Sequence, residues 1–138
     1  MPVAASKTIR SVLAVVAGIA VLTVLSFSIE AVVNPALLYL FAGALPDAAA
    51  LAANLPARLL MMTYSLACVA AGGYVTAWIA RRAPVRHAVA MGVLQALMTI
   101  DVWLSGFASA PAWQWMLSIA LLVPAAWWGA SIRTVGPR

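Results

Sequence analysis

Apolar residues run through this chain in four long stretches, and most of the charged residues lie outside them. The stretches cover about residues 11–33, 56–80, 87–108 and 113–131, and each is close to the ~20 apolar residues that an α-helix needs to cross a bilayer. Backbone polar groups in a bilayer must find their partners within the segment itself, which a helix provides. The pattern therefore predicts an all-α integral membrane protein, a four-helix transmembrane bundle forming one domain over residues 1–138.

The longest connection, residues 34–55, contains Pro35 and Pro46 and carries Asp47 as its one charge. The apolar piece that follows Pro35 is too short to cross a bilayer, and Asp47 is suited to cap a short alanine-rich helix at 48–54. This composition predicts a periplasmic segment that lies in the membrane interface. A re-entrant half-helix that lines a pore is the alternative.

The composition identifies the solvent of this chain as lipid. The chain is 66% hydrophobic and only 8% charged, whereas soluble domains carry about 25% charged residues. A soluble domain of this size could not bury so much apolar surface. The net charge is +5, but the basic residues form no continuous face for phosphates, so we expect no nucleic-acid partner.

The basic residues predict the orientation of the bundle, because cytoplasmic loops are enriched in Lys and Arg. In a four-span arrangement only Arg58 falls on the outer side. The other seven basic residues fall on one side, which is then the cytoplasmic one: Lys7, Arg10, Arg81, Arg82, Arg86, Arg133 and Arg138. Both ends of the chain are therefore expected in the cytoplasm.

The beginning of the chain also resembles a signal peptide, with a basic start, an apolar run and a small-x-small sequence at 26–28. The apolar run is long for a signal peptide, and hydrophobicity resumes directly after Glu30. We therefore predict that the first stretch is a retained span, with cleavage as the alternative.

Ionisable residues inside a span are costly, so each one is a candidate for function. Glu30, Arg58 and Asp101 qualify, and all three lie toward the outer side of the predicted bundle. Asp101 lies deepest and is the leading candidate. Residues three or four apart share one face of a helix, which places further polar residues beside these three. The predicted polar or ion site is Asp101, Glu30, Arg58, Ser105, Ser65 and Ser26.

Two uses of this site are open. Glu30 or Asp101 could bind a cation or carry a proton, with Arg58 as their partner. Alternatively, the charged groups neutralise one another and fix the register of the helices, or reach the interface and stay hydrated.

The chain has no motif for an enzyme. Cys68 is the only cysteine, so neither an intrachain disulfide nor a zinc site of the usual spacing can form. Gly-rich phosphate loops and Cys-x-x-Cys or His-Glu-x-x-His motifs do not occur. We therefore predict a non-enzymatic protein without cofactor or metal. An intramembrane enzyme using Glu30 and Asp101 is the remaining alternative.

The turn between the second and third spans has a distinctive sequence. It reads GGYVTAWIARRAPVRHAVAMG over residues 72–92, and Pro84 is expected to end the helix there. Its arginines Arg81, Arg82 and Arg86 are candidates for contact with lipid headgroups, although orientation alone also explains them. The segment resembles small, largely uncharacterised bacterial four-span membrane proteins. That resemblance implies a bacterial inner-membrane location and carries no activity.

These observations lead to two functional hypotheses. The first is a structural or accessory subunit of a membrane assembly, formed with further copies of the chain or with other membrane proteins. The alternative is a small ion- or proton-coupled transporter or channel subunit that uses Glu30 and Asp101.

Overall fold

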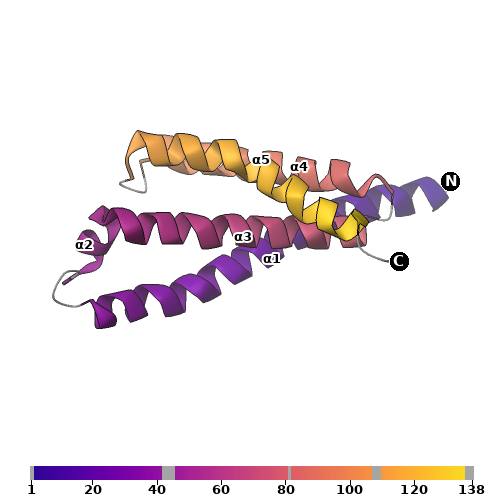
Figure 1. Cartoon of the computed structure of the whole chain (residues 1–138). Coiled ribbons are helices and arrows are strands. Elements are labelled where there is room, and N and C mark those ends of the chain that lie inside the picture. Colours follow the sequence, from indigo (N-terminus) through magenta and orange to yellow (C-terminus); the bar gives the residue numbers. More distant parts are fainter. Residues whose placement is uncertain (1, 42–45, 81, 107–109, 136–138) are drawn as a thin grey trace.

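The computed structural model describes residues 2–41, 46–80, 82–106 and 110–135. These residues form five helices and no strand, which confirms the all-α prediction (Figure 1). The helices are α1 (Pro2–Leu40), α2 (Ala48–Ala53), α3 (Leu55–Ile79), α4 (Pro84–Leu104) and α5 (Ala112–Val135). Thr8–Leu40 of α1 and the whole of α3, α4 and α5 are long and apolar enough to cross a membrane. The chain is therefore a multi-pass membrane protein.

Prolines mark two differences between the predicted and observed helix ends. The α1 helix continues through Pro35 to Leu40, so the predicted end of the first span near residue 33 is wrong. Proline removes one backbone hydrogen bond there, but membrane helices tolerate such a loss where neighbours compensate. Pro84 occupies the first position of α4, where its missing N–H costs nothing. That helix therefore begins three residues before the predicted position 87.

The short helix expected after Asp47 is present as α2, and side chains cap its start and the start of α3. A carboxylate oxygen of Asp47 accepts a hydrogen bond from the Ala50 N–H at 2.8 Å. The Asn54 side-chain oxygen accepts one from the Ala57 N–H at 3.0 Å and so caps the start of α3. Leu51 and Ala57 are buried against each other. These contacts hold α2 against the beginning of α3.

The four long helices form a bundle around α3, which contacts α1, α4 and α5. The α4 helix also contacts both α1 and α5, whereas the described parts of α1 and α5 do not touch. Figure 1 shows α1 and α3 running apart toward the end of the bundle that carries α2. The bundle is therefore closely packed at one end and open at the other.

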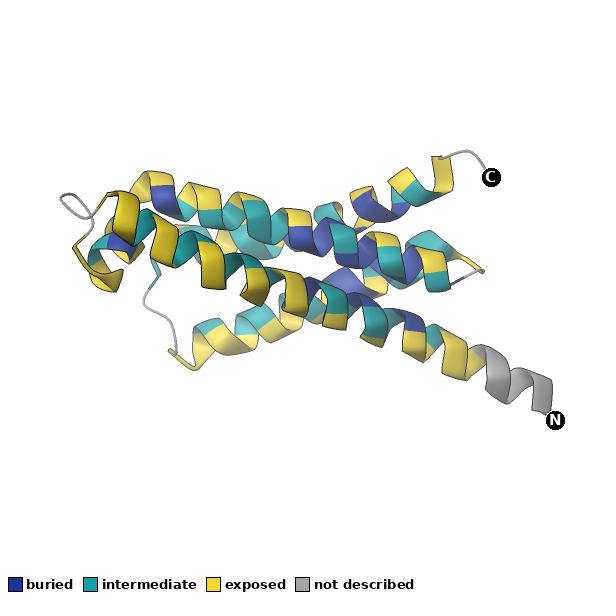
Figure 2. Ribbon diagram, turned by 90° about the horizontal axis from the view of Figure 1, so that it is seen from below, coloured by how far each residue is buried: buried dark blue, intermediate teal, exposed yellow. Residues whose placement is uncertain are grey.

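Small residues allow the helices to pack closely at the end of the bundle away from α2. Among the described residues, the buried positions gather there along all four long helices (Figure 2). Gly18 and Gly72 bring α1 and α3 together, since a Cβ at Gly18 would lie 2.8 Å from the Gly72 carbonyl oxygen. A Cβ at Gly73 would overlap the backbone of Ala126 on α5. The glycines of the hairpin segment thus face α1 and α5.

At this closely packed end, Arg10 caps a helix, whereas Arg82 and Arg86 are exposed. The Arg10 side chain on α1 donates from Nε to the Ile79 carbonyl oxygen at the end of α3, at 2.9 Å. Arg82 and Arg86 are exposed beside the turn between α3 and α4, as the predicted headgroup contact requires. Arg81, the third arginine of that prediction, lies outside the described residues.

Candidate binding cavity between the four spans

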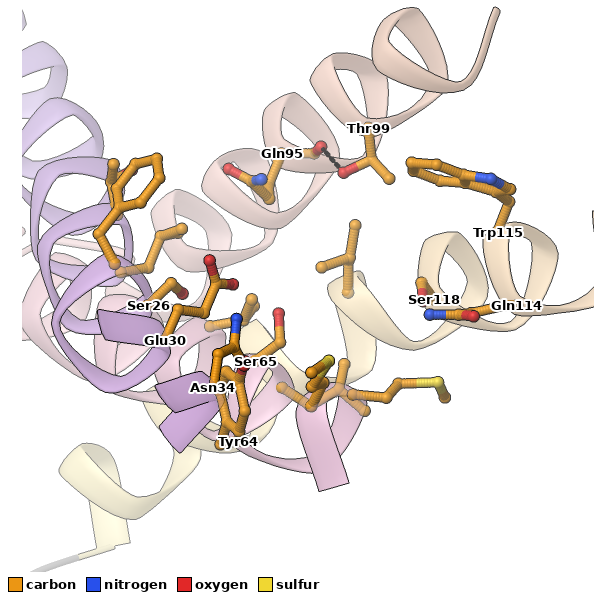
Figure 3. Close-up of a pocket in the computed structure, with 18 residues that line it drawn as sticks. Ser26, Glu30, Asn34, Tyr64, Ser65, Gln95, Thr99, Gln114, Trp115 and Ser118 are labelled. Carbon is orange, nitrogen blue, oxygen red and sulfur yellow. Dashed lines mark hydrogen bonds between the residues drawn. The ribbon is translucent and has the colours of Figure 1, made fainter. Parts of the chain in front are cut away.

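A cavity of about 580 Å³ lies between the four long helices in the open half of the bundle (Figure 3). Each of α1, α3, α4 and α5 contributes to its wall. The lining residues are Leu22, Thr23, Ser26, Phe27, Glu30, Asn34, Met61, Met62, Tyr64, Ser65, Leu66, Val69, Gln95, Thr99, Gln114, Trp115, Ser118 and Leu122. Leu22, Val69 and Leu122 also belong to the buried core, so the closely packed half forms the floor of the cavity.

The polar stripe predicted on the first span faces this cavity. Thr23, Ser26, Glu30 and Asn34 recur at intervals of three or four residues along α1 and all line it, because that spacing keeps side chains on one helical face. Ser65 of α3 lies beside Glu30 and Asn34. Figure 3 shows the side chains of Glu30 and Asn34 on the same wall as Ser65. Three members of the predicted site, Ser26, Glu30 and Ser65, are thus brought together.

The face that α4 presents to the cavity differs from the predicted one. Asp101 and Ser105 are exposed on the outside of the bundle and do not line the cavity. The Ser105 hydroxyl donates to the Val102 carbonyl oxygen at 2.9 Å. Gln95 and Thr99 line the cavity instead, and the Thr99 hydroxyl donates to the Gln95 carbonyl oxygen at 2.8 Å. Asp101 is only three residues from the end of α4, where its carboxylate can reach the interface.

Arg58 is half-buried but also lies outside the cavity. Its guanidinium Nε donates to the Ala52 carbonyl oxygen and so closes the end of α2. No ion pair joins Arg58 to Glu30 or Asp101 in the described part of the chain. The predicted site of three neutralising charges is therefore not formed, and Glu30 is the only acidic or basic residue among the lining residues.

Among the described residues, three of the four buried side-chain polar atoms without a hydrogen-bond partner belong to the cavity lining. Asn34 Oδ1, Gln114 Oε1 and Trp115 Nε1 are inaccessible and form no hydrogen bond. Leaving such an atom unpaired costs about 1–3 kcal/mol, and native proteins satisfy most of them. All three belong to residues that line the cavity. Because these atoms have almost no accessible surface, their side chains would have to turn before a bound molecule or ordered water in this space could supply the missing partners.

Sequence reasoning recognised some of these residues and overlooked the roles of others. Gln114 and Ser118 share a helical face, as their spacing of four predicts. The place of Trp115 in the cavity wall was not predicted. Gln95 and Thr99 carried a usable signal, a second polar face on α4, but Asp101 drew the prediction to the other face.

Comparisons with family models, with curated proteins and with solved structures find nothing that matches this chain. The fold and the cavity therefore define its class on their own: a four-span membrane protein with a partly polar cavity between its helices.

Proposed function

We propose that this chain is a small, non-enzymatic membrane transporter, or the solute-binding subunit of a membrane assembly, that takes up a small polar solute in the cavity. One observation carries this proposal. The cavity combines an unpaired carboxylate, that of Glu30, with three buried polar atoms that have no partner. In a bilayer such groups are costly and rarely retained without a use.

The cavity and four of the five described arginines lie at opposite ends of the bundle, which supports an orientation for the proposed transporter. Arg10, Arg82, Arg86 and Arg133 lie at the closely packed end, where α1 and α4 begin and α3 and α5 end. Loops rich in arginine remain in the cytoplasm. We therefore place this end in the cytoplasm and the cavity on the outer side. The resemblance of the hairpin segment supports a bacterial inner membrane.

Thiol labelling tests whether the cavity takes up solutes. Ser118 lines the cavity, whereas its neighbour Leu117 is 41% exposed on the outer surface of α5 and does not line it. In spheroplasts treated with a membrane-impermeant maleimide, Ser118→Cys should react at least ~10-fold faster than Leu117→Cys, because a lipid-facing thiol rarely ionises. Cys68 is buried, so the unsubstituted chain supplies the blank.

The second candidate function is that of an accessory subunit, and the position of Asp101 favours it. Asp101 shares the exposed face of α4 with Leu97 and Met98, where a carboxylate could contact another copy of the chain or another membrane protein. If Ser118→Cys reacts no faster than Leu117→Cys, the cavity is closed to solutes. That result would contradict the transporter proposal and leave the accessory role.

A further inference from the structure

We infer that the solute is an amphiphilic organic cation, an ammonium group carried on a small apolar or aromatic body. This inference rests on the proposed function, since it names the class of molecule that the same cavity would bind. Three properties of the cavity support it separately. They are its charge, its hydrogen-bonding groups, and its size together with its apolar lining.

The cavity can carry only negative charge. Among the described residues, Glu30 contributes its only carboxylate, and no lysine, arginine or histidine lines the space. Tyr64 is the other titratable group in the lining, and its phenol is uncharged at neutral pH. The nearest predicted counter-charge, Arg58, is bonded to the carbonyl oxygen of Ala52 instead. An unpaired carboxylate within a membrane bundle is stabilised by a cation at close range, and the ligand would provide it.

The polar groups around Glu30 suit a ligand with several N–H donors. Asn34 and Gln114 line the same space and each carry an amide oxygen that has no partner, which a turn of the side chain would present to the cavity. The hydroxyls of Ser26 and Ser65 line the same space and can accept hydrogen bonds. Figure 3 shows Glu30, Asn34 and Ser65 grouped on one side of the cavity, with Gln114 and Ser118 facing them from α5. An ammonium placed beside Glu30 would find acceptors within the same wall.

The size and the apolar lining of the cavity suit a small organic molecule better than a bare metal ion. A volume of about 580 Å³ lies within the range of about 300–1,000 Å³ that is typical of sites for small organic molecules. No three His, Cys, Asp or Glu side chains come together among the described residues, as a metal site would need. The rings of Phe27, Tyr64 and Trp115 line the cavity, and aromatic faces attract organic cations.

Three probes of similar shape and different charge test the inference. The full-length protein in lipid nanodiscs is titrated by calorimetry with phenethylammonium, phenethyl alcohol and phenylacetate, and empty nanodiscs serve as the blank. We expect phenethylammonium to bind at least ~10-fold more tightly than the alcohol, a ratio that corresponds to about 1.4 kcal/mol. Phenylacetate should bind most weakly. Equal or tighter binding of phenylacetate would overturn the inference.

Substitutions of Glu30 test whether its carboxylate causes the preference for phenethylammonium over phenethyl alcohol. Glu30→Gln should remove the ~10-fold preference for the ammonium and leave the affinity for the alcohol unchanged. Glu30→Asp keeps the charge and should retain the preference. Asp101→Asn is the matched control, because Asp101 lies outside the cavity, and it should change nothing. A preference that survives Glu30→Gln would contradict the inference.

The outcomes separate the inference from the proposed function. If the alcohol and phenylacetate bind saturably and the ammonium binds no better, the cavity is a solute site but not a cation site. If none of the probes binds, the cation inference fails, and reactivity of Ser118→Cys decides whether the cavity is open to any solute.

Discussion

Ala83 holds an unusual backbone conformation at the turn between α3 and α4. Its φ is 47°, in the left-handed region, and it is the only non-glycine residue with positive φ in the described part of the chain. The conformation turns its carbonyl oxygen toward α4. That oxygen accepts from the Arg86 N–H at 3.1 Å and lies 3.0 Å from His87 Nδ1. The turn therefore gains these contacts at the cost of strain at Ala83.

Replacing Ala83 with glycine should relieve that strain. The left-handed conformation costs an alanine roughly 1–2 kcal/mol, and part of the gain is offset by the greater entropy of glycine in the unfolded chain. We expect Ala83→Gly to raise the free energy of unfolding in mixed micelles by up to about 1 kcal/mol. Ala90→Gly, at an exposed position inside α4, is the control and should lower it by about 1 kcal/mol. A decrease for both variants would contradict the assignment of strain.

Asp101 and Gln95 show what residue-level reasoning could and could not predict. Helical spacing correctly grouped Ser26 with Glu30, and the same spacing places Gln95 and Thr99 on one face of α4. It could not decide which face of α4 points inward. In water the inward face is the apolar one, but in a bilayer the lipid-facing side is equally apolar. The depth of Asp101 was therefore a poor guide, because its position near the end of α4 leaves it a route to the interface.

At the scale of elements, contacts between glycines and neighbouring backbone set how closely the helices approach. Gly73 of α3 lies against the backbone of Ala126, and Gly129 of α5 lies against that of Ala70. Both contacts join α3 to α5. Pro124 lies within α5 beside this contact, and Figure 1 shows α5 changing direction along its length. The two helices can thus be close at one end and separate around the cavity at the other.

The close contact at Gly73 predicts that Gly73→Ala lowers the free energy of unfolding, whereas Gly→Ala in an open helix raises it. In a helix without close neighbours, Gly→Ala stabilises by up to about 1 kcal/mol. Gly73→Ala would place its Cβ into the Ala126 backbone, so it should lower the free energy of unfolding by about 1–3 kcal/mol. Gly92→Ala meets its nearest atom, Ala126 Cβ, at 3.0 Å and should have a smaller effect. Stabilisation by Gly73→Ala would contradict the packing of α3 against α5.

The number and order of the helices followed from the sequence, while some of their ends did not. Stretches of about 20 apolar residues predict spans directly, and an N-cap signal predicted α2 after Asp47. Pro35 misled the prediction because proline often ends helices in water. Within a membrane protein the helix continued to Leu40, where a break would have exposed further unpaired backbone groups.

At the scale of the whole molecule, the packing divides the bundle into two unequal halves. The half near the arginines is filled by small side chains from all four long helices. The other half encloses the cavity and, among the described residues, has few fully buried positions apart from Leu51 and Ala57 beside α2 (Figure 2). Opening or closing of the cavity would therefore involve the second half, with the first half remaining fixed.

The proposed orientation predicts on which side of the membrane two of the connections between helices lie. Reporter fusions placed after Asp47 should report the periplasm, and fusions placed after Ala83 should report the cytoplasm, because the arginines favour retention of the second connection. Alkaline phosphatase and a fluorescent protein that folds only in the cytoplasm provide opposite readouts for each site. A cytoplasmic signal after Asp47 would contradict the orientation, and with it the outward-facing cavity.

The hydrogen bond from Arg10 to the end of α3 depends on the directions in which α1 and α3 insert into the membrane. Its two groups come from positions 69 residues apart, and they can meet only if α1 begins and α3 ends on the same side of the membrane. If either helix inserted in the opposite direction, a hydrocarbon layer about 30 Å thick would separate them. A chain with inverted α3 would therefore lose this bond and the Gly18–Gly72 approach together. The bond can thus form only when α1 and α3 cross the membrane in opposite directions.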